Sequence, residues 1–175
     1  MDLKKYIRSI PDYPKKGILF RDITTLIKDK DAFKECIDQM SKILMKLDFD
    51  KIASIESRGF VFASALCYNL SKSLILMRKK NKLPAEKYSQ EFELEYGRAT
   101  LEIHKDSIMP KEKVVIIDDL IATGGTAEAG AKLVEKSDGI VSGFLFVINL
   151  FDLGGKKLLE DKGYKSFSLI DFPGH

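Results

Sequence analysis

The sequence has few of the residues that build metal or redox centres. Its 175 residues include two cysteines, Cys36 and Cys67, and two histidines, His104 and His175. The cysteines lie far apart and match no spacing typical of a zinc site or a redox-active pair, and two histidines alone do not build a metal site. We therefore expect two small buried thiols in a reducing cytoplasm, and no metal site made by the protein alone.

Long apolar runs and charge of one dominant sign are also missing. Residues 1–5 lack the apolar core of a signal peptide. The most apolar stretch, 139–151, is interrupted by polar residues and is shorter than the roughly 20 residues that a membrane-spanning helix needs. Lys and Arg number 29 against 26 Asp and Glu, so the net charge of +3 gives no sign of a nucleic-acid partner. The sequence favours a cytoplasmic protein without membrane or nucleic-acid partners.

The order of the expected elements favours an α/β fold. Strand-like runs occur at 51–56, 73–77, 114–117, 142–150 and 166–170, and helical patterns occur at 33–47, 60–70 and 127–136. Such alternation predicts a mostly parallel sheet flanked by helices. Residues 3–10 place their apolar side chains on one helical face, which predicts a first helix ending before Pro11. Without repeats, low-complexity runs or linkers, residues 1–175 are expected to form a single domain.

Residues 87–104 interrupt this alternation. Apolar and charged residues alternate from Phe92 to Tyr96, and the period of two resumes at Leu101 after Gly97. This pattern predicts an antiparallel pair inserted into the parallel core. The pair forms either a mobile lid over a site or an ordinary edge hairpin.

The segment VVIIDDLIATGGT, residues 114–126, combines features that suit a sugar phosphate. Its β-branched run indicates a strand covered on both faces, and Asp118 and Asp119 follow it at the edge where α/β sheets bind ligands. The turn at 122–126 then leads into a helix, whose unpaired N–H groups suit a phosphate. The two carboxylates suit hydroxyl groups instead. A ribose phosphate satisfies both halves of the segment.

Other phosphate-binding motifs fit less well. Gly125 and Gly130 have the glycine spacing of a P-loop, but Ala131 stands where the lysine is needed, and Gly130 falls inside the predicted helix. No Gly-x-Gly-x-x-Gly follows any predicted strand, so a dinucleotide site is unsupported.

The same segment resembles the phosphoribosyl pyrophosphate-binding signature of type I phosphoribosyltransferases. The resemblance is narrowed to adenine phosphoribosyltransferases by YPKKGILFRDIT at 13–24, ESRGF at 56–60, RKKNKLP at 78–84, LEYG at 94–97 and the ending FDLGG…SLIDFPGH. It extends over nearly the whole chain and implies that family's fold, with a small hood mainly from residues 1–30 and a flexible lid at about 87–104. One departure is the pair Lys80 and Asn81, where the family usually has Pro-Gly.

The resemblance also implies an activity and a set of site residues. It implies a homodimeric enzyme that uses Mg²⁺ to make AMP and pyrophosphate from adenine and phosphoribosyl pyrophosphate, with the magnesium held mainly through the substrate. The phosphoribosyl pyrophosphate site would consist of Ser57, Arg58, Arg78, Lys79, Lys82, Asp118, Asp119, Ala122, Thr123, Gly124, Gly125 and Thr126. Residues 57–59 would form the pyrophosphate loop, where similar enzymes have a non-proline cis peptide. The adenine pocket would consist of Leu19, Phe20 and Arg21, with Phe20 stacking on the base and the backbone around Arg21 reading the purine edge.

Two residues have catalytic roles that the resemblance implies. Arg58, together with the basic residues at 78–82, would neutralise the leaving pyrophosphate. The family's dimer passes some of these basic groups across the interface, so Arg78 and Lys79 are candidates for the partner's site. Glu95, in LEYG, would carry the proton that adenine loses, because the family assigns that role to this glutamate.

Two other functions are weighed against this one. Enzymes that act on 6-oxopurines resemble the chain but carry an acid, often Asp, at the position of Ala122; its absence, with FRDIT and LEYG present, favours adenine. A non-catalytic regulator that senses phosphoribosyl pyrophosphate would carry an added DNA-binding domain, for which this chain has no room.

Overall fold

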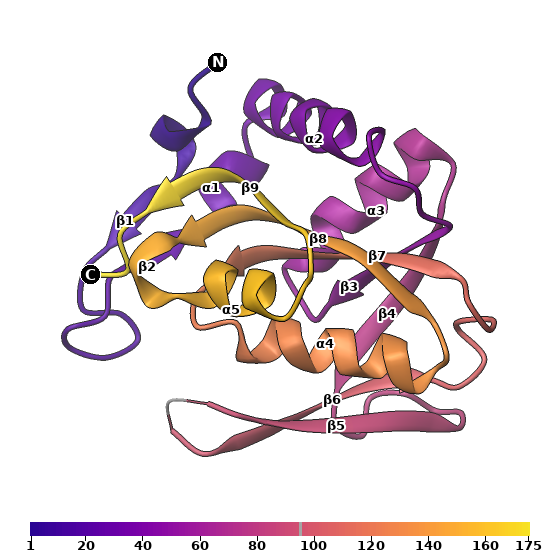
Figure 1. Cartoon of the computed structure of the whole chain (residues 1–175). Helices are drawn as coiled ribbons and strands as arrows, with labels where there is room; N and C mark the ends of the chain where they lie inside the picture. The colour runs from indigo at the N-terminus through magenta and orange to yellow at the C-terminus, as the bar shows by residue number, and fades with distance from the viewer. Residues whose placement is uncertain (95) are drawn as a thin grey trace.

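The computed structural model describes residues 1–94 and 96–175, and its largest element is a seven-stranded sheet (Figure 1). The strands are β3 (Lys51–Ile55), β4 (Ser73–Lys79), β5 (Lys87–Glu93), β6 (Arg98–His104), β7 (Lys113–Ile121), β8 (Ile140–Leu150) and β9 (Ser166–Phe172). Their order in the sheet is β5-β6-β4-β3-β7-β8-β9. β3, β4, β7, β8 and β9 run parallel, whereas β6 is antiparallel to both β4 and β5. The predicted mostly parallel sheet is confirmed.

Helices cover both faces of this sheet (Figure 1). They are η1 (Leu3–Tyr6), α1 (Thr24–Ile27), α2 (Lys30–Leu44), α3 (Gly59–Leu70), α4 (Gly125–Lys136), η2 (Phe151–Leu153) and α5 (Gly155–Asp161). α2 and α3 lie on one side of the sheet, and α4 lies on the other. Among the described residues, no helix combines the length and apolarity needed to cross a membrane.

The central strand β7 explains why the VVII run is apolar throughout. Val115 and Ile117 belong to the core cluster on the side of α2 and α3, and Val114 and Ile116 belong to the cluster on the side of α4. Because successive side chains of a strand point to opposite faces, a strand covered on both faces needs apolar residues at every position.

The two cysteines are buried in this core, as predicted. Cys36 lies in α2 and Cys67 in α3, and neither forms a disulfide. Burial raises the pKa of the Cys36 thiol to about 12 and that of Cys67 to about 11. Both side chains therefore remain protonated thiols that serve packing.

The N-terminal region differs from the predicted first helix over residues 3–10. Only residues 3–6 are helical, as a 3-10 turn whose first N–H groups are capped by Asp2. The chain then forms β1 (Arg8–Ile10), which pairs antiparallel with β2 (Phe20–Asp22). Leu3 and Ile7 are still buried, so the apolar pattern identified the core residues correctly. It gave the wrong element, because the strand depends on a partner farther along the chain.

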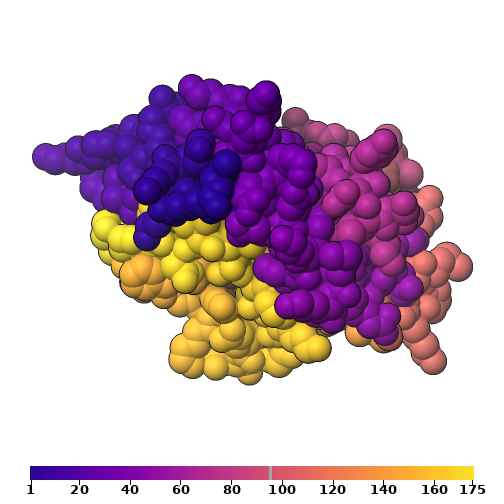
Figure 2. All heavy atoms as spheres, turned by 90° about the horizontal axis from the view of Figure 1, so that it is seen from above, coloured from indigo at the N-terminus to yellow at the C-terminus, as the bar shows by residue number. Residues whose placement is uncertain are grey.

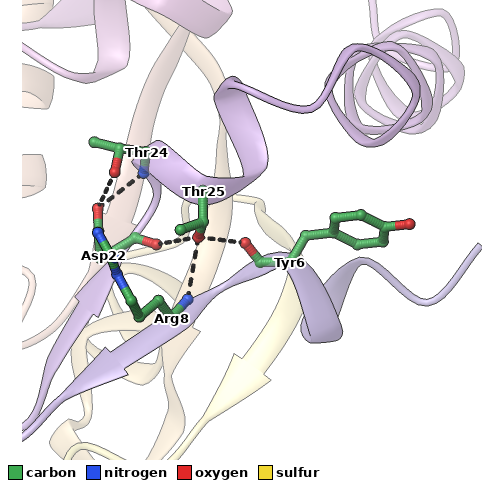
Figure 3. A network of polar contacts seen from close by, with 5 residues as sticks. All are labelled: Tyr6, Arg8, Asp22, Thr24 and Thr25. Carbon is green, nitrogen blue, oxygen red and sulfur yellow. Dashed lines mark hydrogen bonds and ion pairs between the residues drawn. The ribbon is translucent and has the colours of Figure 1, made fainter.

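A network of side chains joins β1, β2 and α1 (Figure 3). Asp22 accepts hydrogen bonds from the N–H and the hydroxyl of Thr24 at 2.9 and 2.7 Å, and from Nε of Arg8 at 3.0 Å. The hydroxyl of Thr25 donates to the carbonyl of Tyr6 at 2.6 Å and accepts from the N–H of Arg8 at 3.3 Å. The hydrogen bonds from Thr24 and Arg8 outweigh burial and lower the pKa of Asp22 to about 2.

The hood also contacts the C-terminal segment, which lies beside it in the view from above (Figure 2). Arg21 is buried and donates from one terminal nitrogen to the carbonyl of Pro173 at 2.8 Å. Its guanidinium lies 4.4 Å from the ring centre of Phe172, a cation–π contact. The hood and the C-terminal segment thus stabilise each other.

The β5–β6 hairpin forms the edge of the sheet, so the predicted antiparallel pair is confirmed. β6 continues the sheet from the end of β4, where Arg78 and Lys79 pair with Glu102 and Leu101. The hairpin also packs along α4, and Nζ of Lys136 donates to the carbonyl of Ser89 at 2.7 Å. Its role as a lid stays a prediction.

Candidate active site

A cavity of about 600 Å³ opens at the carboxyl ends of β3 and β7. Its walls come from residues 55–58 after β3, from residues 118–127 at the junction of β7 and α4, and from the β5–β6 hairpin. Of the residues predicted to bind phosphoribosyl pyrophosphate, the lining includes Ser57, Arg58, Lys79, Asp118, Asp119, Ala122, Thr123, Gly124, Gly125 and Thr126. Segments far apart in the sequence therefore meet at the edge where α/β sheets bind ligands.

The turn at 122–126 has the backbone geometry that a phosphate site needs. Gly124 has a φ of +91°, a left-handed conformation that glycine adopts without strain. α4 begins directly after it at Gly125, and no described side chain caps its first turn. The N–H groups at this helix N-terminus are therefore available to an anion, and the helix dipole favours negative charge there.

The start of α5 supports this turn from outside the cavity. The N–H of Gly155 donates to the carbonyl of Ala122 at 3.0 Å. A Cβ at position 155 would lie 2.4 Å from that carbonyl oxygen and 2.8 Å from the nitrogen of Gly124. Only glycine allows so close an approach, so the backbone of the turn is fixed by a segment that follows β8.

The acid pair lies within β7, which continues to Ile121, rather than after the end of the strand as the sequence indicated. The N–H of Asp119 donates to the carboxylate of Asp118 at 2.8 Å, and Asp119 is buried. Burial, together with the negative charge of Asp119, raises the pKa of Asp118 well above its usual value. Two adjacent carboxylates, one buried and one partly buried, oppose folding unless they have partners. Such a pair with a raised pKa is typical of a ligand site.

Arg58 joins the acid pair to the segment after β3. Its Nε lies 2.7 Å from a carboxylate oxygen of Asp119, and its guanidinium carbon lies 5.4 Å from the ring centre of Phe20. The peptide bond between Glu56 and Ser57, just before it, is cis, as the resemblance implied. Arg58 thus stands between the acids and the hood, with its side chain half exposed toward the cavity.

The basic segment at 78–82 is attached to the same loop through Glu56. One carboxylate oxygen of Glu56 accepts from the N–H of Lys79 at 2.9 Å and from Nε of Arg78 at 3.3 Å. Burial raises the pKa of Glu56, but these bonds outweigh it and lower the pKa overall. Lys79 lines the cavity, whereas Arg78 turns toward Glu56, and Lys82 is exposed outside the described lining.

The predicted adenine residues lie in the hood, next to the cavity rather than in its described lining. Phe20 is half-buried, and its ring meets that of Tyr13 edge to face, with centres 5.1 Å apart. Leu19 is also half-buried. The side chain of Arg21 points away, to Ser9 and Pro173, so any role in base recognition falls to its backbone.

Comparison with known proteins places this geometry in a family. The model of the phosphoribosyl transferase domain family matches residues 23–172. A protein of Pelagibacter ubique named adenine phosphoribosyltransferase is 68% identical over the full length of both chains. The crystal structure of adenine phosphoribosyltransferase from Thermoanaerobacter pseudethanolicus is 50% identical and superimposes with a TM-score of 0.93 over 98% of each chain. This chain belongs to the adenine phosphoribosyltransferases. The yeast member of that family, solved in complex with an imino-altritol bisphosphate and adenine, is 34% identical, with a TM-score of 0.89 over 97% of each chain.

Glu95, the proton carrier that the resemblance to adenine phosphoribosyltransferases implies, lies outside the described residues. Its neighbour Tyr96 is exposed, and Nζ of Lys15 lies 4.4 Å from the centre of its ring. This contact joins the tip of the hairpin to the hood loop. Glu93, two residues earlier, is largely exposed, and its carboxylate lies 3.7 Å from Arg98.

Three residues that shape the site were not predicted from the sequence. Phe92 and Thr100 line the cavity from the hairpin, and Gly155 supports the turn. The period of two placed Phe92 in the predicted antiparallel pair, but nothing in the pattern indicated that it lines a cavity. Gly155 belongs to the FDLGG motif, which contributed to the resemblance, but the sequence did not indicate what this glycine does in the structure.

Proposed function

We propose that this chain transfers the phosphoribosyl group of phosphoribosyl pyrophosphate to adenine and releases pyrophosphate and AMP. The observation that carries the proposal is the meeting of the turn at 122–126, the acid pair and Arg58 around one cavity. The turn suits the 5′-phosphate, and the carboxylates suit the ribose hydroxyls. The activity named for the relatives supports the choice of adenine.

The acid pair stabilises the sugar ring as positive charge develops on it during the reaction. Displacement at the anomeric carbon passes through an oxocarbenium-like state, and negative charge held beneath the ring lowers the energy of that state. In the described structure Asp119 is paired with Arg58. We propose that Arg58 moves to the pyrophosphate when substrate binds, which leaves Asp119 to accept a hydrogen bond from a ribose hydroxyl.

The pyrophosphate leaves toward the basic groups around Glu56. Ser57 and Arg58 form the loop at the end of β3, and Lys79 lines the cavity beside it. Arg58 and Lys79 would bind the oxygens on which charge develops, with Arg78 and Lys82 adding positive charge nearby. Of these, Arg58 carries the catalytic role, because it also contacts the acid pair.

The residues present fit a magnesium ion that is held mainly by substrate. The described residues contain no group of three or more His, Cys, Asp or Glu side chains that could hold a metal. Magnesium is commonly bound by one or two carboxylates plus substrate phosphates, and Asp118 and Asp119 are placed to contribute that share. When bound, the ion would neutralise charge that builds on the pyrophosphate.

The base is held between the hood and the hairpin. Phe20 offers a ring for stacking next to Arg58, and the backbone at Leu19 and Arg21 offers donors and acceptors to the purine edge. We propose Glu95 as the group that takes the proton from adenine. The lid formed by residues 87–104 would exclude water, which otherwise hydrolyses phosphoribosyl pyrophosphate.

The test of the function is an assay of the purified protein with phosphoribosyl pyrophosphate, magnesium and each purine in turn. A site that hydrogen-bonds the 6-amino edge leaves polar groups unpaired with a 6-oxopurine, so AMP should form at least roughly a hundredfold more efficiently than IMP. Ala122 cannot supply the acid that 6-oxopurine enzymes carry there. Comparable efficiencies with hypoxanthine would exclude the adenine assignment, and no turnover with any purine would favour a binding protein.

The proton-transfer role is tested by Glu95→Gln, which is nearly isosteric but cannot accept a proton. General acid–base catalysis contributes about 10²–10⁴ in rate, so turnover should fall by that order while the affinity for phosphoribosyl pyrophosphate hardly changes. Glu93→Gln is the matched control, because that side chain is largely exposed. Equal losses in the two variants, or only a few-fold loss in Glu95→Gln, would remove Glu95 from the mechanism.

We propose further that the enzyme is a cytoplasmic homodimer. The two buried free thiols suit a reducing compartment. Val61 and Tyr68 on α3 and Leu76 on the adjacent strand β4 expose large apolar side chains, as a dimer interface would. Sedimentation as a monomer at assay concentration would contradict the dimer. Hybrids of Arg58→Ala with an Arg78→Ala/Lys79→Ala variant separate two arrangements: regained activity would mean that Arg78 and Lys79 serve the partner's site, and no activity would mean that they serve the cavity of their own chain, which Lys79 lines.

A further inference from the structure

Glu102 is a buried carboxylate that the mechanism above does not use. It lies in β6 with 3% of its surface exposed, between the core residues Leu101 and Ile103. Within the described part of the chain it forms no ion pair. In that part of the chain, the carboxylate of Glu102 accepts two hydrogen bonds, one from the backbone N–H of Asn81 and one from the hydroxyl of Ser89, both at 3.1 Å. A buried carboxylate opposes folding unless it is hydrogen-bonded, so these two hydrogen bonds are needed to keep Glu102 in the sheet.

The strand register places Glu102 of β6 between Arg78 of β4 and Ser89 of β5, on the side of the predicted lid that borders the basic segment. Arg78 of β4 and Ser89 of β5 are its direct partners on the two neighbouring strands. Residues directly opposite each other in a sheet share a face, so one carboxylate can reach groups that belong to both strands. One carboxylate oxygen of Glu102 accepts from the turn after β4, and the other accepts from Ser89 in β5.

The turn after β4 depends on this contact for its shape. Asn81 has a φ of +66°, in the left-handed region where Asn is tolerated better than most residues other than glycine. The chain then continues toward β5, and on the way the N–H of Ala85 donates to Nε2 of His104, the last residue of β6, at 3.2 Å. The bond to Glu102 holds the backbone N–H of Asn81, which lies in the chain between Lys79 and Lys82.

Two carboxylates therefore hold the backbone of the basic segment from different elements. Glu56, beside the pyrophosphate loop, accepts from the N–H of Lys79, and Glu102, in the lid strand, accepts from the N–H of Asn81. We propose that Glu102 is a positioning residue. Through its hydrogen bonds to Asn81 and Ser89 it holds the segment with the pyrophosphate-binding lysines in a fixed position relative to β5 of the predicted lid. This inference rests on the proposed function, since it assumes that the segment binds pyrophosphate.

The role predicts a selective effect on one substrate. A hydrogen bond to a charged acceptor corresponds to a factor of about ten to a hundred in an equilibrium constant. Glu102→Leu fills the same space without an acceptor, so the KM for phosphoribosyl pyrophosphate should rise about tenfold or more, while the KM for adenine changes less than about threefold. Glu102→Gln keeps one oxygen for the N–H of Asn81, so its KM should lie between wild type and Glu102→Leu.

The control is a neighbouring core residue that touches neither partner. Ile103→Val loosens the same strand, and its KM for phosphoribosyl pyrophosphate should stay within about twofold of wild type while Tm falls slightly. Amide hydrogen exchange at Asn81, measured without substrate, should be faster in Glu102→Gln than in wild type and unchanged in Ile103→Val. This second measurement also serves if Glu102→Leu does not fold.

Opposite outcomes are clear. A Glu102→Leu variant with an unchanged KM for phosphoribosyl pyrophosphate, or an Ile103→Val variant that matches its rise, would overturn the inference, as would unchanged exchange at Asn81 in Glu102→Gln. Failure of wild-type protein to form AMP would instead overturn the proposed function, and the exchange experiment would still report on the contact itself.

Discussion

The phosphate half of the cavity and the hood are held together in different ways. In the phosphate half, Arg58, Asp119 and the turn at 122–126 are carried by adjacent parallel strands and the helices that follow them. In the hood, two three-residue strands form a separate antiparallel sheet, and Asp22 connects it to its surroundings by accepting from Arg8 and Thr24. The first region is built from long strands of the main sheet, whereas the second has few backbone pairs and relies more on polar side chains.

The glycines of the two regions show the same contrast. A Cβ at Gly59 would lie 2.9 Å from the carboxylate of Asp118, and one at Gly155 would lie 2.4 Å from the carbonyl of Ala122. In the hood, a Cβ at Gly17 would meet nothing within 4 Å. Substitutions in the phosphate half should therefore affect phosphoribosyl pyrophosphate and turnover, whereas those in the hood should affect adenine and local stability.

The largest effect is expected from removing charge in the phosphate half. Asp118→Asn with Asp119→Asn keeps the shape of both side chains but removes the negative charge beneath the developing oxocarbenium ion. Turnover should fall by about 10²–10³, the range found when one electrostatic contact to a transition state is lost. Circular dichroism should show an intact fold. Full activity in the double variant would mean that the acids are structural.

A change outside the cavity should act through the turn alone. Gly155→Ala forces its new methyl against the carbonyl of Ala122, so the backbone of the turn proposed to bind phosphate must shift. A misplacement of about 1 Å can cost roughly a hundredfold in rate, so kcat/KM for phosphoribosyl pyrophosphate should fall by that order. Lys157→Ala, an exposed change in the same helix, is the control. If both variants behave like wild type, α5 does not support the site.

The hood should respond through the other substrate. Phe20→Ala removes the ring proposed to stack on adenine, and stacking on an aromatic side chain contributes about 1–3 kcal/mol per base. The KM for adenine should rise about tenfold, with the KM for phosphoribosyl pyrophosphate nearly unchanged. Ile18→Ala, a partly exposed neighbour, serves for comparison. Equal effects on both substrates would break the division between the two regions.

The smallest effect is on stability, at Asp22. Because its pKa is lowered in the folded chain, the ionised carboxylate stabilises the hood in full above the ordinary pKa of about 3.9, and this contribution is lost as pH falls toward about 2. Asp22→Asn should lower the free energy of unfolding by about 1–2 kcal/mol at pH 7. Denaturant titrations should show the difference narrowing below about pH 4, and Asp106→Asn, a change at an exposed position, is the control.

The same contrast decides what could be predicted from the sequence. β7, the acid pair and the turn at 122–126 are contiguous, and each part has a local signal: a β-branched run, two carboxylates and paired glycines. The elements of the sheet were predicted for the same reason. The predicted end of β7 was wrong, because pairing with β8 extends the strand through the acids to Ile121. β4 and β9 also end two residues later than predicted.

The hood was predicted poorly because its structure depends on distant partners. Residues 8–10 become a strand only by pairing with residues 20–22, so the helical spacing of their apolar residues gave the wrong element. The side chain of Arg21 is held by Pro173 at the far end of the chain. The supports given by Glu102 and Gly155 also connect separate segments, and no local pattern reveals such contacts.

The close approach of Gly155 to the turn has a consequence for redesign. A mutational library aimed at a new base can vary the exposed residues 11–16 of the hood loop widely, but not Gly17, whose φ of +87° disfavours any side chain. The same library should leave positions 124 and 155 invariant, although neither would contact the base. Selection for a different purine would then change recognition at one end of the substrate while sugar-phosphate binding is inherited unchanged.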